Sequence, residues 1–179
     1  MIDLVPYDSA WPRAFAAEAD RLRHALPDLL VDLHHMGSTA IPGIIAKPVI
    51  DILAVVEKVE ALDAHSEAFE ALGYEVMGEF GIPGRRYFRK DDASGRRTHH
   101  VHAFARGSGE IARHLDFRDY LRAHPAAAEA YAVLKRTLAL ECGDDTRRYT
   151  EGKAAFVREI DTRAARWRVD PNATEPRFS

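Results

Sequence analysis

The segment 47–56, KPVIDILAVV, limits the fold of this chain more than any other part of it. Its apolar residues follow one another almost without interruption, which is the pattern of an interior β-strand that is covered on both faces. A single carboxylate, Asp51, lies in the middle of the run. An ionised carboxylate in such a place is strongly destabilising unless it is paired or binds a metal ion. The segment therefore predicts an interior strand and, from elsewhere in the chain, a partner for Asp51.

The residues on either side of this strand predict two helices and a second strand. Apolar residues at helical spacing predict a first helix with Ser9 as its N-cap and Pro12 in its first turn, closed by Pro27. The segment 28–36 is typical of a strand. An amphipathic helix is predicted over 59–73, because apolar residues recur on one face and a glycine ends the pattern.

The rest of the chain predicts further strands and then a helical part. Strands are predicted over 74–80, 85–91 and 97–105. The short GIPG and DASG connections between them favour antiparallel neighbours. Helices are predicted over 110–123, 126–141 and 146–167. This order of elements predicts an α+β fold, with a mixed β-sheet flanked by helices and a C-terminal helical part.

The length of 179 residues predicts a single domain over residues 1–169, and residues 170–179 predict a disordered tail because they have little to bury. Cys142 is the only cysteine, so no internal disulfide can form and a reducing compartment is indicated. The N-terminal residues lack the features of a signal peptide, and no run reaches the roughly 18 apolar residues of a membrane span. We therefore expect a soluble, cytoplasmic protein.

The charge balance narrows the class of ligand. The net charge of −3 comes from 25 basic and 28 acidic residues, so no overall basic field favours nucleic acid as a partner. Neither GxGxxG nor GxxxxGK[ST] occurs in the sequence, which removes the main support for dinucleotide and P-loop sites. A small phosphate ligand bound by clustered charge remains compatible with this composition.

A candidate phosphate site follows the first predicted strand. Gly37, Ser38 and Thr39 offer free backbone N–H groups and hydroxyls to an anion. The alternative is a tight turn capped by a serine. Basic residues that could contact a phosphate are Lys47, Arg86, Arg89 and Lys153. Alternatively, the basic residues form a solvated charged rim.

The histidines of the segment THHVHAF supply candidate partners for Asp51. On a strand, His100 and His102 share one face about 7 Å apart, and with a carboxylate from a neighbouring strand they could hold one metal ion. His35 shares a face with Gly37 and could reach the same pocket. The alternatives are a structural ion pair at Asp51 and a histidine pair that faces solvent.

Five blocks of the sequence resemble the GrpB-like family of bacterial proteins. These blocks are HHMGSTAIPGIIAKPVIDILAVV, GRRYFRK, THHVHAF, HLDFRDYLRAHP and RRYTEGKAAFV. That family is similar to the nucleotidyltransferase superfamily, whose sheet carries Gly-Ser at the end of the first strand and acidic residues on the second. The resemblance places Gly37, Ser38 and Asp51 at the matching positions.

The chain departs from the superfamily at the second acidic position, which lies two residues after the first and is occupied here by Leu53. Transfer chemistry with two metal ions requires carboxylates that bridge both ions. The departure puts ordinary transfer activity in doubt and favours a site with one metal ion, supplemented by histidines.

Three functions remain open from the sequence. The first is a nucleotidyltransferase-like domain that binds a nucleotide or other phosphate ligand with a divalent metal ion (Mg, Mn or Zn), in which Asp51, His100 and His102 would be the catalytic residues of a transferase. The second is a non-catalytic binding or folding-accessory module, since a similar domain is fused to dephospho-coenzyme A kinase in some bacteria. The third is a metal-dependent hydrolase that uses the same Asp and His residues to hold a metal-bound water.

Overall fold

The computed structural model describes residues 2–171, within which five strands form one sheet. The α-helices are α1 (Trp11–Ala25), α2 (Ser66–Ala71), α3 (Gly109–Ala123), α4 (Pro125–Cys142), α5 (Thr146–Gly152) and α6 (Ala154–Val169). The strands are β1 (Leu30–Met36), β2 (Ile50–Val56), β3 (Tyr74–Val76), β4 (Arg85–Asp91) and β5 (Arg97–Ala105). Two 3₁₀ helices, η1 (Ser38–Ala40) and η2 (Val59–His65), complete the set.

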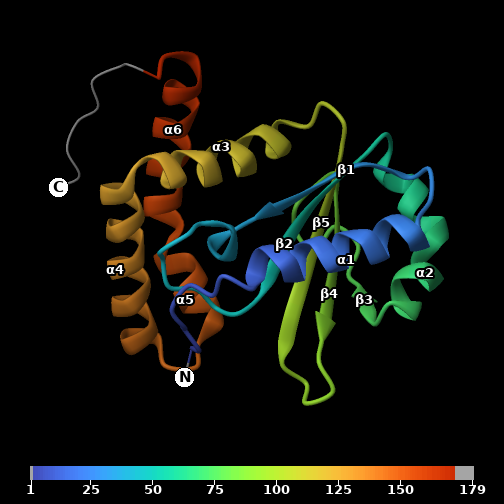
Figure 1. The fold of residues 1–179 in the computed structure, drawn as a ribbon, viewed down its shortest axis with the longest axis horizontal. Helices are drawn as coiled ribbons and strands as arrows, with labels where there is room; N and C mark the ends of the chain where they lie inside the picture. Colours follow the sequence, from blue (N-terminus) through green and yellow to red (C-terminus); the bar gives the residue numbers. More distant parts are fainter. Residues whose placement is uncertain (1, 172–179) are drawn as a thin grey trace.

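The strand order in the sheet is β1-β2-β5-β4-β3 (Figure 1). Strands β2 and β5 are parallel, and the other neighbours are antiparallel. Strand β2 therefore has a neighbour on both sides, as its apolar sequence predicts. The predicted α+β fold, with a mixed sheet and a C-terminal helical part, is confirmed.

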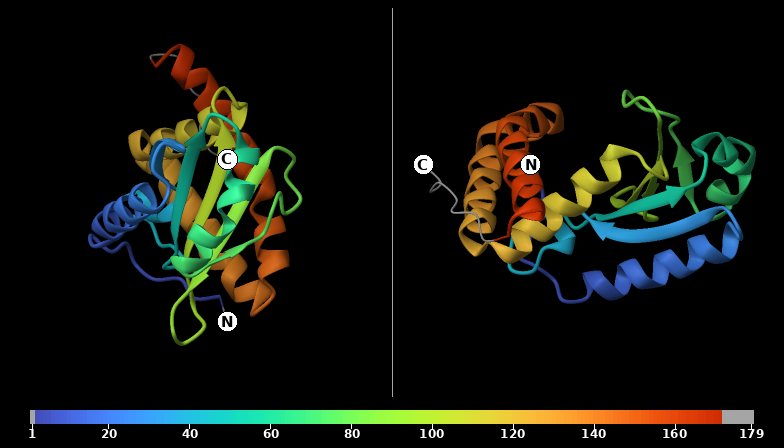
Figure 2. Two further views of the ribbon diagram at one scale, coloured as in Figure 1. Left: turned by 90° about the vertical axis from the view of Figure 1, so that its right-hand side faces the viewer. Right: turned by 90° about the horizontal axis from the view of Figure 1, so that it is seen from above.

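The two faces of the sheet have different neighbours. Helix α1 runs along one face, and helices α4–α6 gather at one end of the molecule (Figure 2). The core on the α1 face is apolar and includes Leu22, Ile52, Phe69, Phe88 and Val101. The opposite face carries Asp51, because residues on one strand alternate between the faces. Within residues 2–171, no helix combines the length and the apolar composition that crossing a membrane requires.

Some predicted boundaries are wrong for local reasons. Ser9 is not the cap of α1, because the helix begins at Trp11 and its N-cap position is Ala10, without a side-chain hydrogen bond. The predicted helix over 59–73 is split into η2 and α2, and the predicted helix over 146–167 is split between α5 and α6. Strand β3 ends early because Gly78 and Phe80 adopt positive φ angles of 62° and 46°. From residue 172 onward, the predicted tail lies outside the described residues.

The turn after β1 brings η1 against Asp51. Gly37 has a φ of 70°, and a Cβ at this position would overlap Asp51 Oδ2, so only glycine fits. The Thr39 hydroxyl donates to the Val49 carbonyl at 3.1 Å, so it accepts from His35 Nε2 at 3.0 Å. These contacts fix the turn beside the start of β2.

Residues 2–5 connect the sheet side of the molecule to the helical part. Val5 and Ala46 exchange backbone hydrogen bonds of 2.9 and 3.0 Å. The Ile2 N–H donates to the Gly143 carbonyl at 2.9 Å, beyond the end of α4. The Ile2 side chain packs with Cys142 and Tyr149. This N-terminal clasp, residues 2–5, therefore contacts both sides.

A buried carboxylate attaches α1 to the far edge of the sheet. Glu18 is only 1% exposed and accepts hydrogen bonds from Lys90 Nζ at 2.8 Å and from the Tyr74 hydroxyl at 3.0 Å. Burial would raise the pKa of Glu18, but the hydrogen bonds and the charge of Lys90 outweigh it and lower the pKa. Glu18 is therefore ionised and paired in the folded state.

We expect Lys90→Met to lower the free energy of unfolding by about 2–3 kcal/mol at neutral pH, because it leaves a buried charge with only Arg21 as a cation partner. The loss should shrink as the pH falls toward the ordinary glutamate pKa of about 4.3, where Glu18 of the variant becomes protonated. Urea unfolding of the wild type and the variant between pH 4 and 8 measures this loss of unfolding free energy. The double variant Glu18→Gln/Lys90→Met should recover most of the loss, and a single variant as stable as wild type would contradict the pairing.

Candidate phosphate and metal site

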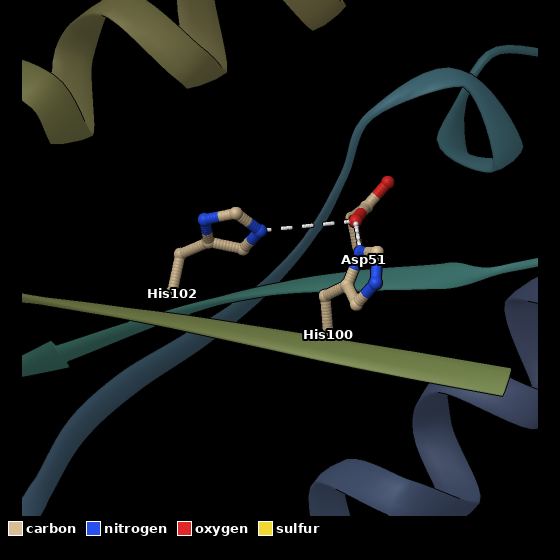
Figure 3. Close-up of side chains that lie close together, drawn as sticks. All are labelled: Asp51, His100 and His102. Atoms are coloured by element: carbon tan, nitrogen blue, oxygen red, sulfur yellow. Dashed lines mark hydrogen bonds and ion pairs between the residues drawn. The ribbon is translucent and has the colours of Figure 1, made fainter. Parts of the chain in front are cut away.

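The strand register brings the predicted metal ligands together on one face of the sheet. Asp51 on β2 is paired with His100 on β5, and Leu53 is paired with His102. His100 Nδ1 lies 2.9 Å and His102 Nε2 lies 3.8 Å from Asp51 Oδ1 (Figure 3). The ligating atoms of the three residues all lie within 4.8 Å of one another.

The spacing of Asp51 and His100 suits one metal ion, and His102 lies close enough to join them if the nitrogen that faces Asp51 is unprotonated. Two ligand atoms that are each about 2.1 Å from one ion lie roughly 3.0–3.5 Å apart. The distances from Asp51 Oδ1 to His100 and His102, 2.9 and 3.8 Å, lie close to this range. One carboxylate and two imidazoles suit Mn²⁺ or Zn²⁺ better than Mg²⁺.

The carboxylate of Asp51 is charged in this setting. Burial would raise the pKa of Asp51, but the hydrogen bonds and charges of His100 and His102 outweigh it and hold the pKa well below its usual range. Burial also lowers the pKa of His102. At neutral pH the site therefore offers an anionic oxygen and a neutral His102 ring.

Arg85 of β4 distinguishes the two histidines. Its Nη1 lies 3.3 Å from His102 Nδ1, and a guanidinium can only donate. His102 Nδ1 must therefore accept, and the neutral ring carries its proton on Nε2, toward Asp51. Histidines that bind metals usually donate from their second nitrogen instead. His100 is thus the better placed of the two as a ligand.

A pocket of about 210 Å³ opens beside Asp51 and His100. Its walls include Ser38 and Thr39 of η1 and Tyr149 and Thr150 of α5. Three lysines from separate parts of the chain also line it: Lys47, Lys135 and Lys153. We call this cavity the lysine pocket. The structure thus brings Ser38, Thr39, Lys47 and Lys153, all predicted ligand residues, to one place, with Gly37 adjacent to Ser38.

Lys135 of α4 is the lysine that sequence reasoning missed. It is 2% exposed, and its Nζ donates to Ser38 Oγ at 3.2 Å and to the Ile45 carbonyl. Burial, with repulsion from Lys153, lowers the pKa of Lys135 to about 7. The available signal was its position in α4, because it lies one helical turn after the buried residues Tyr131 and Ala132.

The other two lysines lie over one aromatic ring. Lys47 Nζ is 4.7 Å and Lys153 Nζ is 4.4 Å from the centre of the Tyr149 ring. Burial and the charge of Lys47 lower the pKa of Lys153 to about 8. Burial also lowers the pKa of Lys47, although Asp51 opposes this. The pocket therefore concentrates ammonium groups that mutual repulsion and burial disfavour.

The arginines of the β4–β5 hairpin do not line this pocket. The two strands are antiparallel, as predicted, and Arg89 lies opposite His100. The Arg89 Nε donates to Glu75 at 2.5 Å, however. The sequence predicts that the hairpin brings Arg89 or Arg86 toward the histidines, and Arg89 is the one on their face. Arg86, a predicted ligand residue, lies on the other face and pairs with Asp63 at 2.6 and 2.8 Å.

His35 also lies away from the metal ligands. Its ring is buried on the α1 face, stacked on Phe15 with a centroid distance of 5.0 Å. Burial lowers the pKa of His35 to about 4, so the ring is neutral. His35 supports the turn through Thr39 and does not line the lysine pocket.

Several proteins are similar to this chain over most of its length. The UPF0157 protein YqkA of Bacillus subtilis is 42% identical over 171 residues, which are 96% of this chain, and this chain spans only 49% of YqkA. A crystal structure of GrpB from Enterococcus faecalis is 41% identical and covers 94% of this chain and 100% of that one, with a TM-score of 0.88. The dephospho-CoA kinase of Mycobacterium tuberculosis is 29% identical over 188 residues, covering 92% of this chain and 46% of that protein.

More distant structures share the fold alone. The Cid1 poly(U) polymerase, solved with MgGTP bound, has a TM-score of 0.52 and 12% identity, covering 75% of this chain and 44% of that one. The nucleotidyltransferase-like fold that the family resemblance implies is thus confirmed. The model of the family described as "GrpB protein" matches residues 1–163. The chain therefore belongs to the GrpB family.

Proposed function

We propose that this chain binds a nucleotide through its phosphate groups in the lysine pocket, together with one divalent cation at Asp51. The observation that carries the proposal is the meeting of Lys47, Lys135 and Lys153 with Asp51 in one pocket of about 210 Å³. A polyanion is the ligand that satisfies several ammonium groups at once. A cation beside it then completes the charge balance around the carboxylate.

The electrostatics of the pocket support a ligand with more than one negative charge. The pKa values of Lys135 and Lys153 are lowered to about 7 and about 8. Phosphate oxygens would raise both pKa values by opposing the repulsion, and the gain would appear as binding free energy. The hydroxyl of Ser38 and the backbone beside Gly37 add hydrogen-bond donors at the same wall.

A second cavity supports a nucleotide rather than inorganic phosphate. It has a volume of about 440 Å³ and shares Lys47 and Val49 with the lysine pocket. Ile2, Pro48 and Thr98 are among its other walls. Most of its walls are charged or polar: Asp3, Lys47, Asp92, Arg96, Arg97, Thr98, Asp144 and Thr146. A cavity of this size, with hydrogen-bonding groups beside a few apolar side chains, can hold the base and sugar of a small ligand. The nucleotide bound to Cid1, which shares the fold, agrees with this class of ligand.

Each residue of the metal site has a separate role in this proposal. Asp51 and His100 would hold the cation, and His102 would orient the Asp51 carboxylate under the influence of Arg85. A divalent cation bound there would polarise a phosphoryl oxygen. The lysines bind and align the phosphates in the lysine pocket, which His100 also lines.

We expect Mn²⁺ or Zn²⁺ to raise the melting temperature of the wild type more than Mg²⁺ does. At 100 times its dissociation constant, a bound ion adds about 2.7 kcal/mol, or roughly 5–10 °C for a chain of this size. Asp51→Asn should abolish the response to every ion, because the anionic ligand is lost. The double variant His100→Ala/His102→Ala should erase the preference for Mn²⁺ and Zn²⁺. An unchanged metal response in Asp51→Asn would contradict the site.

Tripolyphosphate with Mn²⁺ tests the lysine pocket directly, by calorimetric titration. Lys153→Met should weaken binding by about 10- to 100-fold, which corresponds to one charged hydrogen bond. Wild-type affinity should also fall between pH 7 and pH 9, as Lys135 and Lys153 lose their protons. Lys58→Met is the matched control, because Lys58 is exposed and lies outside the pocket. Equal losses in both variants would mean that only net charge matters.

One observation favours a metal-dependent hydrolase as a second candidate. Leu53, at the second acidic position of the superfamily, is 0% exposed and packs with Met36 and Phe104. Of the two positions that match the acidic pair of the superfamily, only Asp51 carries a carboxylate, which suits one metal-bound water better than a two-metal transfer. Incubation of ATP with the protein and Mn²⁺, followed by ³¹P NMR, separates the candidates. Released phosphate supports hydrolysis, whereas tight binding without turnover supports a binding module.

A further inference from the structure

The loop between β3 and β4 presents an exposed aromatic ring in an unusual backbone conformation. Phe80 is 57% exposed and has a φ of 46°, in the left-handed region. Its neighbours Gly78 and Gly81 also have positive φ angles, of 62° and 80°. A residue with a side chain is disfavoured there by roughly 1–2 kcal/mol, and glycine is not. The turn itself therefore does not call for a phenyl ring at this position.

The ring of Phe80 continues a row of rings that begins at the metal site. It stacks on Tyr87 of β4, with a centroid distance of 5.3 Å and an interplanar angle of 25°. Tyr87 lies opposite His102 in the sheet, and its ring is 5.5 Å from the ring of His100 and 5.0 Å from that of His102. Phe80 thus lies within two ring spacings of both histidines. We call Phe80 and Tyr87 the aromatic shelf.

Arg85 holds the shelf in a fixed position relative to the site. Its Nη2 donates to the Phe80 carbonyl at 2.8 Å, and its Nε donates to the Glu79 carbonyl at 3.2 Å. The same guanidinium reaches His102 and lies 4.9 Å from the centre of the Tyr87 ring. Arg85 is only 6% exposed, so these contacts are protected from water. The exposed ring is therefore preorganised.

The shelf and the lysine pocket both adjoin His100, but they share no residue. His100 and Asp51 line the lysine pocket, but Tyr87 and Phe80 do not. A ligand whose phosphates occupy the pocket therefore leaves the shelf open. The shelf offers a second place for a ligand, next to the same ligating side chains.

We propose that the aromatic shelf binds the nucleobase of a second ligand, a nucleoside-bearing molecule distinct from the nucleotide in the lysine pocket. The assignment of this molecule as a second substrate rests on the proposed function. A nucleobase has π-faces that stack on Phe80 and polar edges that can meet the imidazoles and Arg89 on this face. An apolar protein segment would instead bury those polar groups without partners, which is unfavourable.

Adenosine is a suitable probe because it lacks a phosphate and so does not compete for the lysines. Saturation-transfer NMR would follow it on the full chain, with the lysine pocket loaded with tripolyphosphate and Mg²⁺, and with ribose as the control ligand. We expect transfer to the adenine protons and none to ribose. Phe80→Ala should weaken adenosine binding by about 5- to 100-fold, the range found for loss of one stacked base. Phe80→Trp should retain binding.

Phe80→Leu is the matched control for apolar contact, because it keeps an exposed apolar side chain but removes the π-face. It should lose binding as Phe80→Ala does, while both variants melt close to the wild type. Equal adenosine binding by wild type and Phe80→Ala would overturn the proposal. So would a melting temperature lowered as by a core substitution, since the ring would then serve the fold.

The two proposals fail separately. If tripolyphosphate does not bind the wild type but adenosine binds in a Phe80-dependent manner, the lysine pocket is wrong and the shelf stands. If tripolyphosphate binds and adenosine binding does not depend on Phe80, the shelf is wrong and the pocket stands.

Discussion

The candidate site depends on one contact between neighbouring parallel strands, that of Asp51 on β2 with His100 on β5, at 2.9 Å. An interior strand leaves its carboxylate no access to solvent except through the face above the sheet. The parallel register places the His100 imidazole beside the Asp51 carboxylate. Both residues belong to strands rather than loops, so their relative position is as rigid as the sheet. The turn at Gly37 then closes over the second carboxylate oxygen, where a side chain would not fit. The helical part supplies the remaining wall of the pocket, through α4 and α5.

Much of this arrangement could be predicted from the sequence, because it follows from strand periodicity. The apolar run around Asp51 predicts an interior strand, and the alternation of His100, Val101 and His102 predicts which rings share a face. The short hairpin connection predicts that β4 and β5 are antiparallel. What periodicity does not determine is the face of the sheet on which each arginine of β4 lies. Arg85 faces the histidines, and Arg86 faces away.

The contacts of Lys135 and Phe80 could not be predicted for a different reason, although helical spacing in α4 gives a signal that Lys135 is buried. Lys135 belongs to a helix rich in alanine, where a lysine ordinarily marks the solvent face, and only the packing of α4 against the turn buries it. Phe80 lies in a loop whose conformation is determined by its glycines and by Arg85. Arg85 contacts the backbone carbonyl of Phe80 rather than its side chain. Contacts between distant segments leave no periodic trace in the sequence.

The N-terminal clasp has a consequence for how the walls of the pocket can move. One wall comes from the sheet and η1, and the other comes from α4 and α5, so opening by a hinge between them would separate Ala46 from Gly143. Residues 2–5 form backbone hydrogen bonds with Ala46 on one side and with Gly143 on the other, and so connect the two walls. A hinge motion would break these backbone bonds and expose Ile2. The clasp therefore opposes hinge opening, and we expect the two walls of the pocket to keep a nearly constant separation when a ligand enters or leaves.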